Sequence, residues 1–155
     1  MGFDRAEYLR SDNVGKAAVI AFLQSIGYEP VINPEPQIDI TAKGQTNGVP
    51  FHIEAEVKRD WIGDFKYTDV HIPARKGRHK ANQPSFIMVV SGDSKKAFLF
   101  PTQYLRDERI VNKRVRNNRE PENFYSVLVE DCMLVSIPDH SAREMIESAT
   151  RKLIS

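Results

Sequence analysis

The segment FHIEAEVKRDW, residues 51–61, constrains the fold most strongly, because apolar and ionisable residues alternate along it. The apolar positions are Phe51, Ile53, Ala55 and Val57, and the ionisable positions are His52, Glu54, Glu56 and Lys58. Successive side chains of a strand point to opposite faces, so this period of two predicts a strand with one apolar face. The other face is either ordinary solvated surface or a surface with a chemical function, and the alternation alone does not separate the two.

A second strand is predicted just before it, in the segment QIDITAKG at residues 37–44, where Asp39 stands between two isoleucines. The intervening GQTNG, residues 44–48, contains two glycines and is typical of a turn. Two strands joined by such a turn form an antiparallel hairpin. If Asp39 pairs near Glu56, two carboxylates converge in this hairpin with Lys58 beside them.

Such a grouping has the ligands that a hard metal ion requires. Mg²⁺ prefers oxygen ligands, binds one or two protein carboxylates and keeps several water molecules. A bound Mg²⁺ lowers the pKa of its water, and a neighbouring lysine can stabilise an anionic phosphate. The hairpin therefore predicts a Mg²⁺ site at Asp39 and Glu56, for which Mn²⁺ is an expected substitute. Glu54 is a further candidate ligand.

The rest of the chain predicts a helix, a strand meander and a final helix. Residues 11–30 predict a largely buried helix that ends near Gly27, and residues 138–155 predict the last helix, opened by a Ser141–Glu144 capping box. The segments between them are expected to be a strand at 65–73 that can pair back on the previous strand, a loop or short helix at 74–83, a central strand at 85–93, a strand at 95–101, a mixture of helix and loop at 102–123, and one or two strands at 124–137. We therefore predict an α/β or α+β fold, with a mixed central β-sheet flanked by helices, as one domain spanning residues 1–155.

Composition narrows the class of protein further. Of the 155 residues, 41% are hydrophobic and 28% are charged, which is ordinary for a soluble globular domain. The single cysteine, Cys132, excludes an internal disulfide framework and fits a reducing compartment. The N-terminus lacks the apolar run of a signal peptide, and no apolar run approaches the ~20 residues of a membrane span. We expect a cytoplasmic protein without a membrane partner.

The residues of the hairpin resemble a known family. A helix, then Asp39 on a strand, then a turn, then Glu56-Val57-Lys58 at the end of the next strand is an order similar to that of the PD-(D/E)XK nuclease superfamily. This superfamily includes type II restriction enzymes, archaeal Holliday junction resolvases, and many phage and repair nucleases. The resemblance covers residues 12 to about 100. It implies a restriction-endonuclease-like core and a Mg²⁺-dependent nuclease.

The resemblance also implies a role for each residue of the motif. Asp39 and Glu56 would bind the metal together with the backbone carbonyl of Val57, and Lys58 would assist hydrolysis. Apart from the resemblance, Glu54 on the same face of the strand is expected to be either a third carboxylate that tunes the metal or replaces Asp39, or an ordinary surface carboxylate.

The acid-x-lysine pattern alone is weak, because it occurs three times in this chain. The other two matches, Asp64-x-Lys66 and Asp93-x-Lys95, lie in predicted turns rather than at the end of an alternating strand. Some features depart from the family. Asp39 follows an isoleucine instead of proline. The first helix lacks the glutamate found in junction resolvases, because its matching region has Asn13 and Lys16 and Glu7 is expected to lie upstream of it. The glutamine-x-x-x-tyrosine element of exonuclease branches is also missing after the motif, which argues against a processive exonuclease.

Positive charge is concentrated in two segments, although the net charge is only +1. RKGRHK, residues 75–80, has four Lys or Arg residues and no acid, and residues 106–119 have six against two acids. Such clusters can bind an anionic partner, with a solvated surface of mixed charge as the alternative. The residues expected to contact nucleic-acid phosphates are Arg59, Arg75, Lys76, Arg78 and Lys80. Residues 106–119 would be a second DNA-contacting arm or a loop near a dimer interface.

The leading hypothesis is a Mg²⁺-dependent endonuclease that hydrolyses DNA, with duplex, branched and single-stranded substrates all open. A Holliday junction resolvase is the main alternative within the enzyme class, and enzymes of that kind act as homodimers because two strands need two sites. A second class of protein remains, a nucleic-acid-binding or regulatory module that has this fold without catalysis, because a fold does not determine function. A structural or host-interaction protein is a third possibility.

Overall fold

The computed structural model describes residues 5–32, 39–45, 47–81, 83–114, 120–137 and 141–152, with side chains from residue 14 onward except that of residue 141. These parts contain two α-helices, α1 (Arg5–Ser25) and α2 (Ser141–Lys152). The strands are β1 (Val31–Ile32), β2 (Ile40–Lys43), β3 (Pro50–Lys58), β4 (Asp69–Pro73), β5 (Ser85–Ser91), β6 (Lys96–Pro101), β7 (Ile110–Lys113), β8 (Glu122–Leu128) and β9 (Met133–Ser136). Short 3₁₀ helices are η1 (Ala74–Ala81), η2 (Thr102–Tyr104), η3 (Asp107–Arg109) and η4 (Val129–Asp131).

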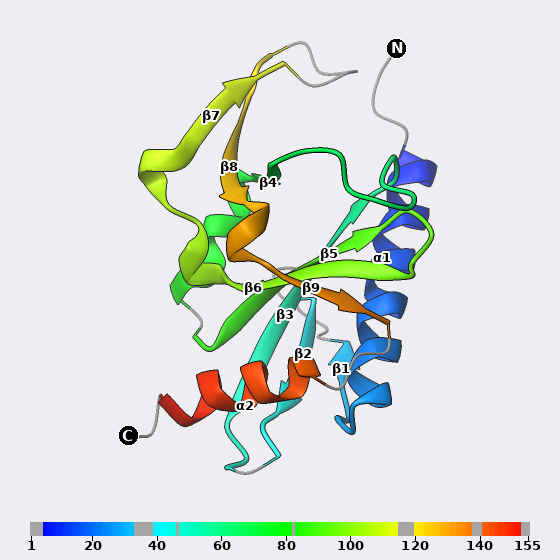
Figure 1. The fold of residues 1–155 in the computed structure, drawn as a ribbon, viewed down its shortest axis with the longest axis vertical. Coiled ribbons are helices and arrows are strands. Elements are labelled where there is room, and N and C mark those ends of the chain that lie inside the picture. Colours follow the sequence, from blue (N-terminus) through cyan, green and yellow to red (C-terminus); the bar gives the residue numbers. More distant parts are fainter. Residues whose placement is uncertain are drawn as a thin grey trace.

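The central sheet has six strands in the order β1-β2-β3-β5-β6-β9 (Figure 1). The pair β3–β5 is parallel and the other pairs are antiparallel, so the predicted mixed sheet is confirmed. The predicted β2–β3 hairpin is also confirmed. Strand β5 is buried at every residue, as its unbroken apolar run predicts for a strand in the middle of a sheet.

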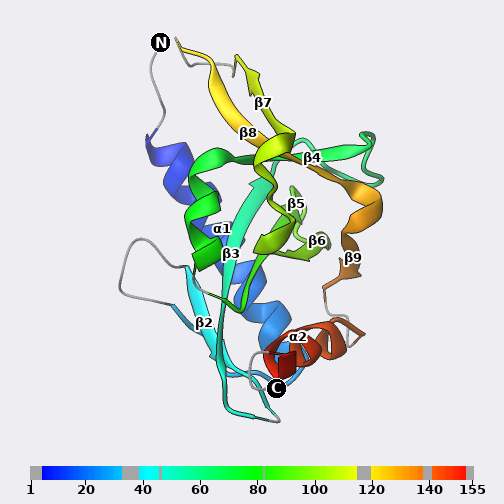
Figure 2. The ribbon, with the colours of Figure 1, turned by 90° about the vertical axis from the view of Figure 1, so that its left-hand side faces the viewer.

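The two faces of the central sheet are covered in different ways. On one face, Phe51 and Ile53 of β3 pack with Val19 and Phe22 of α1 and with Ile146 of α2 in one buried cluster. On the other face, the strands β5 and β6 pack against β4 and β8, which belong to a second sheet of three strands in the order β4-β8-β7 (Figure 2). The predicted helices therefore flank one face, and a second sheet covers the other.

The second sheet corrects two predictions. Strand β4 does not pair back on β3; it pairs with β8, with Asp69 opposite Leu128. The chain between β3 and β4 turns over the central sheet, where the Trp61 ring stacks on Phe98 with 4.7 Å between ring centroids. This contact belongs to the buried cluster between the two sheets. Residues 110–113, expected as helix or loop, form β7 and pair with β8.

Helix α1 begins at Arg5, earlier than the predicted start near Ser11. The prediction that Glu7 lies upstream of the first helix is therefore wrong, although the side chain of Glu7 is not among those described. The end near Gly27 is confirmed by a positive φ of 96° and by the bond from Tyr28 N to Leu23 O. Helix α2 is also confirmed, whereas the side chain of its predicted capping residue, Ser141, is outside the described part.

A close approach between α1 and β3 brings the helix near the polar residues of the hairpin. A Cβ atom added to Gly15 would lie 2.8 Å from Val57 Cγ2, so only glycine fits here without a shift. The next residue of the helix, Lys16, can therefore reach the start of β2.

Candidate active site

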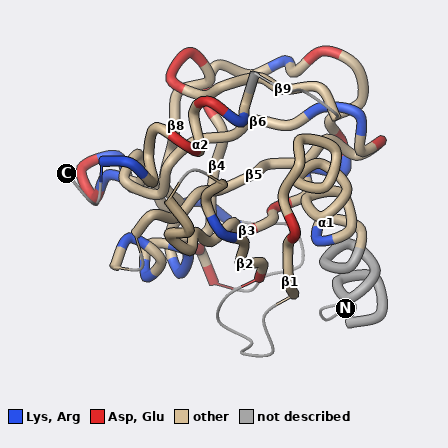
Figure 3. The backbone as a smooth tube through the Cα atoms, turned by 90° about the horizontal axis from the view of Figure 1, so that it is seen from below, with Lys and Arg blue, Asp and Glu red and all other residues tan. Residues whose placement is uncertain are grey.

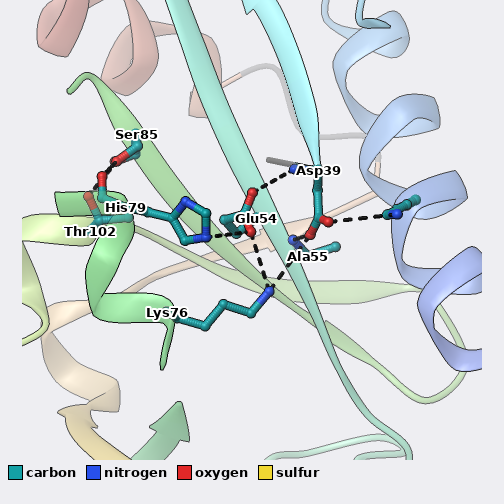
Figure 4. Close-up of polar contacts among 8 residues, drawn as sticks. Asp39, Glu54, Ala55, Lys76, His79, Ser85 and Thr102 are labelled. Carbon is teal, nitrogen blue, oxygen red and sulfur yellow. Dashed lines mark hydrogen bonds and ion pairs between the residues drawn. The ribbon is translucent and has the colours of Figure 1, made fainter. Parts of the chain in front are cut away.

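A hydrogen bond links Asp39 to Glu54 where the β2–β3 ladder ends, and a second joins Asp39 to the backbone of Ala55 (Figure 4). The register pairs Ile40 with Ile53, and β2 begins at Ile40, so Asp39 stands opposite Glu54 just beyond the ladder. The Asp39 N–H donates to Glu54 Oε2 at 2.7 Å, and the Ala55 N–H donates to Asp39 Oδ2 at 3.0 Å. The side chains thus replace the missing backbone partners, and two carboxylates are held side by side in a buried place.

Two lysines from separate elements face this carboxylate pair. Lys76 of η1 has its Nζ 3.4 Å from Glu54 Oε1 and 3.8 Å from Asp39 Oδ2. Lys16 of α1 has its Nζ 3.7 Å from Asp39 Oδ1. Lys76 is only 9% exposed, so its charge is stabilised mainly by these carboxylates. Two positive charges therefore balance two negative ones, which is the condition under which buried charges are tolerated.

His79 is a third neighbour of Glu54, and it is 1% exposed. Its Nε2 lies 2.9 Å from Glu54 Oε1, but the approach is poorly directed, and Nε2 has no hydrogen-bond partner among the described residues. Its backbone carbonyl accepts a bond of 2.8 Å from Ser85 Oγ, which also contacts Thr102 Oγ1 (Figure 4). These hydroxyl contacts hold η1 against the central sheet and so keep His79 over Glu54.

The two carboxyl groups have pKa values that are displaced in opposite directions. Burial raises the pKa of Asp39, and the charge of Glu54 adds to this, while Lys76 opposes it. Burial also acts to raise the pKa of Glu54, but the contacts with His79 and Lys76 outweigh it and the pKa is lowered. Adjacent carboxyl groups with separated pKa values are a common feature of sites that bind metals or transfer protons.

Glu56 is not the residue that meets Asp39, which corrects the predicted pairing. It lies two residues beyond Glu54 on the same face of β3, ~6–7 Å along the strand, and it is half-buried. The cause is the hairpin register, in which the turn closes between Gly44 and Val49 and places Asp39 opposite Glu54. Among the described contacts, the acid that Asp39 meets is Glu54.

Lys58 also lies away from the carboxylate pair. Its Nζ donates to the backbone oxygen of His71 in β4 at 2.8 Å. Burial lowers its pKa, which the charge of Glu56 opposes and that of Lys113 reinforces. Val57 packs against the helix-side core, and the role of its carbonyl stays a prediction.

The residues predicted to contact phosphates lie in different environments. Arg59, Arg75 and Arg78 are exposed. Lys80 is half-buried, with its Nζ bound to Leu105 O at 2.9 Å, and Lys76 is buried against the carboxylates and is not a surface residue. Figure 3 shows that lysines and arginines form separate groups around the described chain, with acidic residues between them.

The donor set of the carboxylate pair fits a hard divalent cation. Mg²⁺ needs only one or two protein carboxylates, and Asp39 and Glu54 supply two that are already oriented by backbone hydrogen bonds. A cluster of three His, Cys, Asp or Glu side chains able to hold a metal ion does not occur in the described part of the chain. Within the described part of the chain, Asp39 and Glu54 are thus a pair that could supply two oxygen ligands to such an ion.

Sequence reasoning missed the roles of Lys16, Lys76 and His79 in this cluster. A signal for two of them was present, because Lys76 and His79 are three residues apart in a basic segment. In a 3₁₀ helix, with three residues per turn, this spacing places both side chains on one face. Lys16 had no such signal, because its place depends on the packing of α1 on β3.

The fold is similar to that of the Holliday junction resolvase Hjc from the archaeal hyperthermophile Archaeoglobus fulgidus, with a TM-score of 0.52. The similarity covers 86% of this chain and 95% of that chain, with 11% sequence identity. At this identity the likeness shows the fold alone, and it confirms the predicted restriction-endonuclease-like core. No family model and no curated protein matches the chain. Neither of the described helices is long and apolar enough to cross a membrane.

Proposed function

We propose that the chain is a metal-dependent nuclease that hydrolyses DNA phosphodiester bonds, as an endonuclease, with residues 1–155 forming one domain. The observation that supports this most is the buried pair of carboxylates, Asp39 and Glu54, each of which accepts a backbone hydrogen bond, with Lys76 beside both. The fold supports it as well, since a structural neighbour is a Holliday junction resolvase. We place the metal ligands at Asp39 and Glu54, with Mg²⁺ as the ion and Mn²⁺ as a substitute.

Each residue of the cluster has a task in this proposal. A Mg²⁺ ion bound at Asp39 and Glu54 would supply an activated water and stabilise charge on the phosphate. The backbone bonds from Asp39 N and Ala55 N orient the carboxylates. Lys76 places a positive charge where an anionic phosphate would lie, once its ammonium leaves the carboxylates. His79, buried next to Glu54, would help to shield that carboxylate from water.

The residues further along β3 form the alternative set. Glu56, Lys58 and the Val57 carbonyl would hold the metal and assist hydrolysis if the ion lies nearer the end of the strand. Lys58 then needs its lowered pKa to exchange a proton with water, and the bond to His71 O would position it. Exposed Arg59, Arg75 and Arg78 would contact DNA phosphates in either case.

The test is cleavage of plasmid, single-stranded and branched DNA with Mg²⁺ or Mn²⁺. We expect Glu54→Gln to lower the rate by roughly a thousandfold, because a metal ligand stabilises the transition-state charge directly. Glu56→Gln, its matched control on the same face of the same strand, should stay within about tenfold of the wild type. A wild-type protein that cuts no substrate would contradict the proposed function. Full activity in Glu54→Gln would contradict the site.

A Holliday junction resolvase is the second candidate, favoured by the coverage of 95% of the resolvase chain. An enzyme of that kind needs two active sites and therefore a homodimer. Sedimentation of the protein with a four-way DNA junction checks this: a dimer that cuts the junction in preference to linear duplex supports it. A strictly monomeric protein that nicks linear DNA equally well contradicts it.

A binding module without catalysis is the third candidate, because Lys16 and Lys76 already balance the two carboxylates. Such a module would bind DNA but neither bind Mn²⁺ nor cut. In all three cases we propose DNA as the partner and the cytoplasm as the location.

A further inference from the structure

An open pocket lies outside the carboxylate cluster, between the segment that carries η2 and η3 and the end of β8. Its volume is ≈ 260 Å³, and its wall includes Tyr104, Arg106, Arg109, Ser126 and Asp131. Two arginines against one aspartate give this wall one net positive charge. A phosphodiester carries one negative charge, so the wall and a nucleotide linkage are complementary in charge.

Tyr104 presents a preorganised aromatic surface at this pocket. Its ring lies nearly parallel to that of Phe100, with 10° between planes and 6.4 Å between centroids. Phe100 is completely buried, whereas Tyr104 is 39% exposed. The core therefore fixes the plane of an exposed ring, which is the arrangement on which an unpaired base stacks with little loss of side-chain entropy.

The two arginines are available for an anion. Arg109 donates from Nε to Ser126 O at 3.1 Å, which holds its guanidinium at the pocket wall. Arg106 is exposed, and its side chain has no ion pair within the described part of the chain. Guanidinium groups match phosphate oxygens in geometry as well as charge.

Direct contacts connect the segment that forms the pocket with an element of the candidate active site. Lys80 of η1 donates from Nζ to Leu105 O at 2.9 Å and lies 3.4 Å from Asp107 Oδ1. The segment from Tyr104 to Arg109 therefore contacts η1, the element that carries Lys76 and His79. A strand bound at the pocket would run beside the element that covers the carboxylates.

We propose that this pocket, the Tyr104 pocket, binds one nucleotide unit of single-stranded DNA, with the base on Tyr104 and the phosphate at Arg106 and Arg109. The inference deepens the proposed function, since it rests on DNA as the partner and assigns an unpaired strand as the preferred substrate form. A duplex end or a branch point would supply such a strand.

The experiment is fluorescence anisotropy of a labelled oligothymidylate, in EDTA so that no cleavage occurs. Tyr104→Leu should weaken binding roughly tenfold, because stacking on one base is lost. Tyr104→Phe should bind as the wild type does, because its ring is kept. Arg106→Gln should reduce the slope of log affinity against log salt by about 0.7, which is the loss of one phosphate contact on a single strand.

The controls are Tyr67→Leu and Arg143→Gln, which change an exposed tyrosine and an exposed arginine outside the pocket. Equal weakening in the controls would overturn the proposal, and so would wild-type affinity in Tyr104→Leu. A blunt duplex should lose little affinity in Tyr104→Leu, because its bases are already stacked; an equal loss there would overturn the base contact. Thymidine monophosphate should bind far more weakly than the oligonucleotide. Tighter binding of the monophosphate would contradict the proposal that the ligand of the pocket is a DNA strand.

Failure of this inference and failure of the nuclease proposal are distinguishable. If the protein binds the oligonucleotide through Tyr104 but cuts no DNA, the pocket proposal stands and the nuclease proposal is wrong. If the protein cuts DNA but Tyr104→Leu and Arg106→Gln bind the oligonucleotide as the wild type does, the nuclease proposal stands and the pocket proposal is wrong.

Discussion

The two ends of the polar face of β3 differ although their sequences look alike. Glu54 lies at a buried end, where Asp39, Lys76 and His79 surround it. Lys58 lies at the other end, where its ammonium bonds to a backbone oxygen of the second sheet. Alternating acids and bases in one strand therefore meet very different neighbours, and the neighbours decide which of them can form a metal site.

The difference also appears in the ionisation of these groups. At the buried end, a carboxylate and an ammonium face each other without water to separate them, so the electrostatic coupling is strong. At the Lys58 end the lysine is half-buried and bonds to a neutral carbonyl, and its pKa falls because burial disfavours the charge. Only the buried end has two acids in mutual contact.

The largest expected effect is the difference in stability loss between substitutions of Lys76 and Lys58. Lys76→Met removes the ammonium between Asp39 and Glu54, and an unpaired buried charge typically costs about 3–5 kcal/mol. Lys58→Met removes one hydrogen bond to a carbonyl, worth about 1 kcal/mol. Urea denaturation at neutral pH measures both. Millimolar Mg²⁺ should restore part of the stability of Lys76→Met and leave that of Lys58→Met unchanged; equal losses in the two variants would contradict the contrast.

A smaller expected effect is the different way in which Glu54 and Asp39 make the stability of the fold depend on pH. The pKa of Glu54 is lowered from 4.5, so its charged form stabilises the fold above that pH, and this contribution is lost as pH falls through the lowered pKa. Glu54→Gln should therefore destabilise the protein at pH 7 by about 2 kcal/mol, and should match the wild type below the lowered pKa.

Replacing Asp39 should change the stability at pH 7 in the opposite direction. Its pKa is raised from 3.8, so its neutral form contributes stability that is present below 3.8 and lost as pH rises through the raised pKa. Asp39→Asn should then stabilise the protein at pH 7 by about 1 kcal/mol, with an oxygen that still accepts from Ala55 N. Thermal melts of both variants across the acid range measure this, and a shift of the same sign in both would contradict the assignment.

The parts of the fold that could be predicted are those with a local signal. The alternation in β3 and the apolar run in β5 gave strands, and the turn between β2 and β3 gave a hairpin. The site could be predicted only in part, because a shift of register by two residues exchanges Glu56 for Glu54 while keeping the same face of the strand. Turn geometry sets that register, and the letters GQTNG are compatible with more than one.

The rest depended on contacts between distant segments. Lys76 reaches Glu54 across 22 positions of the chain, through a 3₁₀ helix whose place is held by Ser85 and Thr102. The segment that leads to the second sheet packs on the central sheet through Trp61 and Phe98, a contact that no local pattern predicts. Tertiary packing of this kind overrides local propensity and cannot be read from short windows.

The most direct test of the account is calorimetric titration of Mn²⁺ into the DNA-free protein. We predict that the wild type binds the ion, that Asp39→Asn and Glu54→Gln lose it, and that Glu56→Gln and Lys58→Met bind it as the wild type does. The measurement needs no cleavage, so it tests the carboxylate pair by itself. Loss of the ion in Glu56→Gln together with unchanged binding in Glu54→Gln would contradict the account.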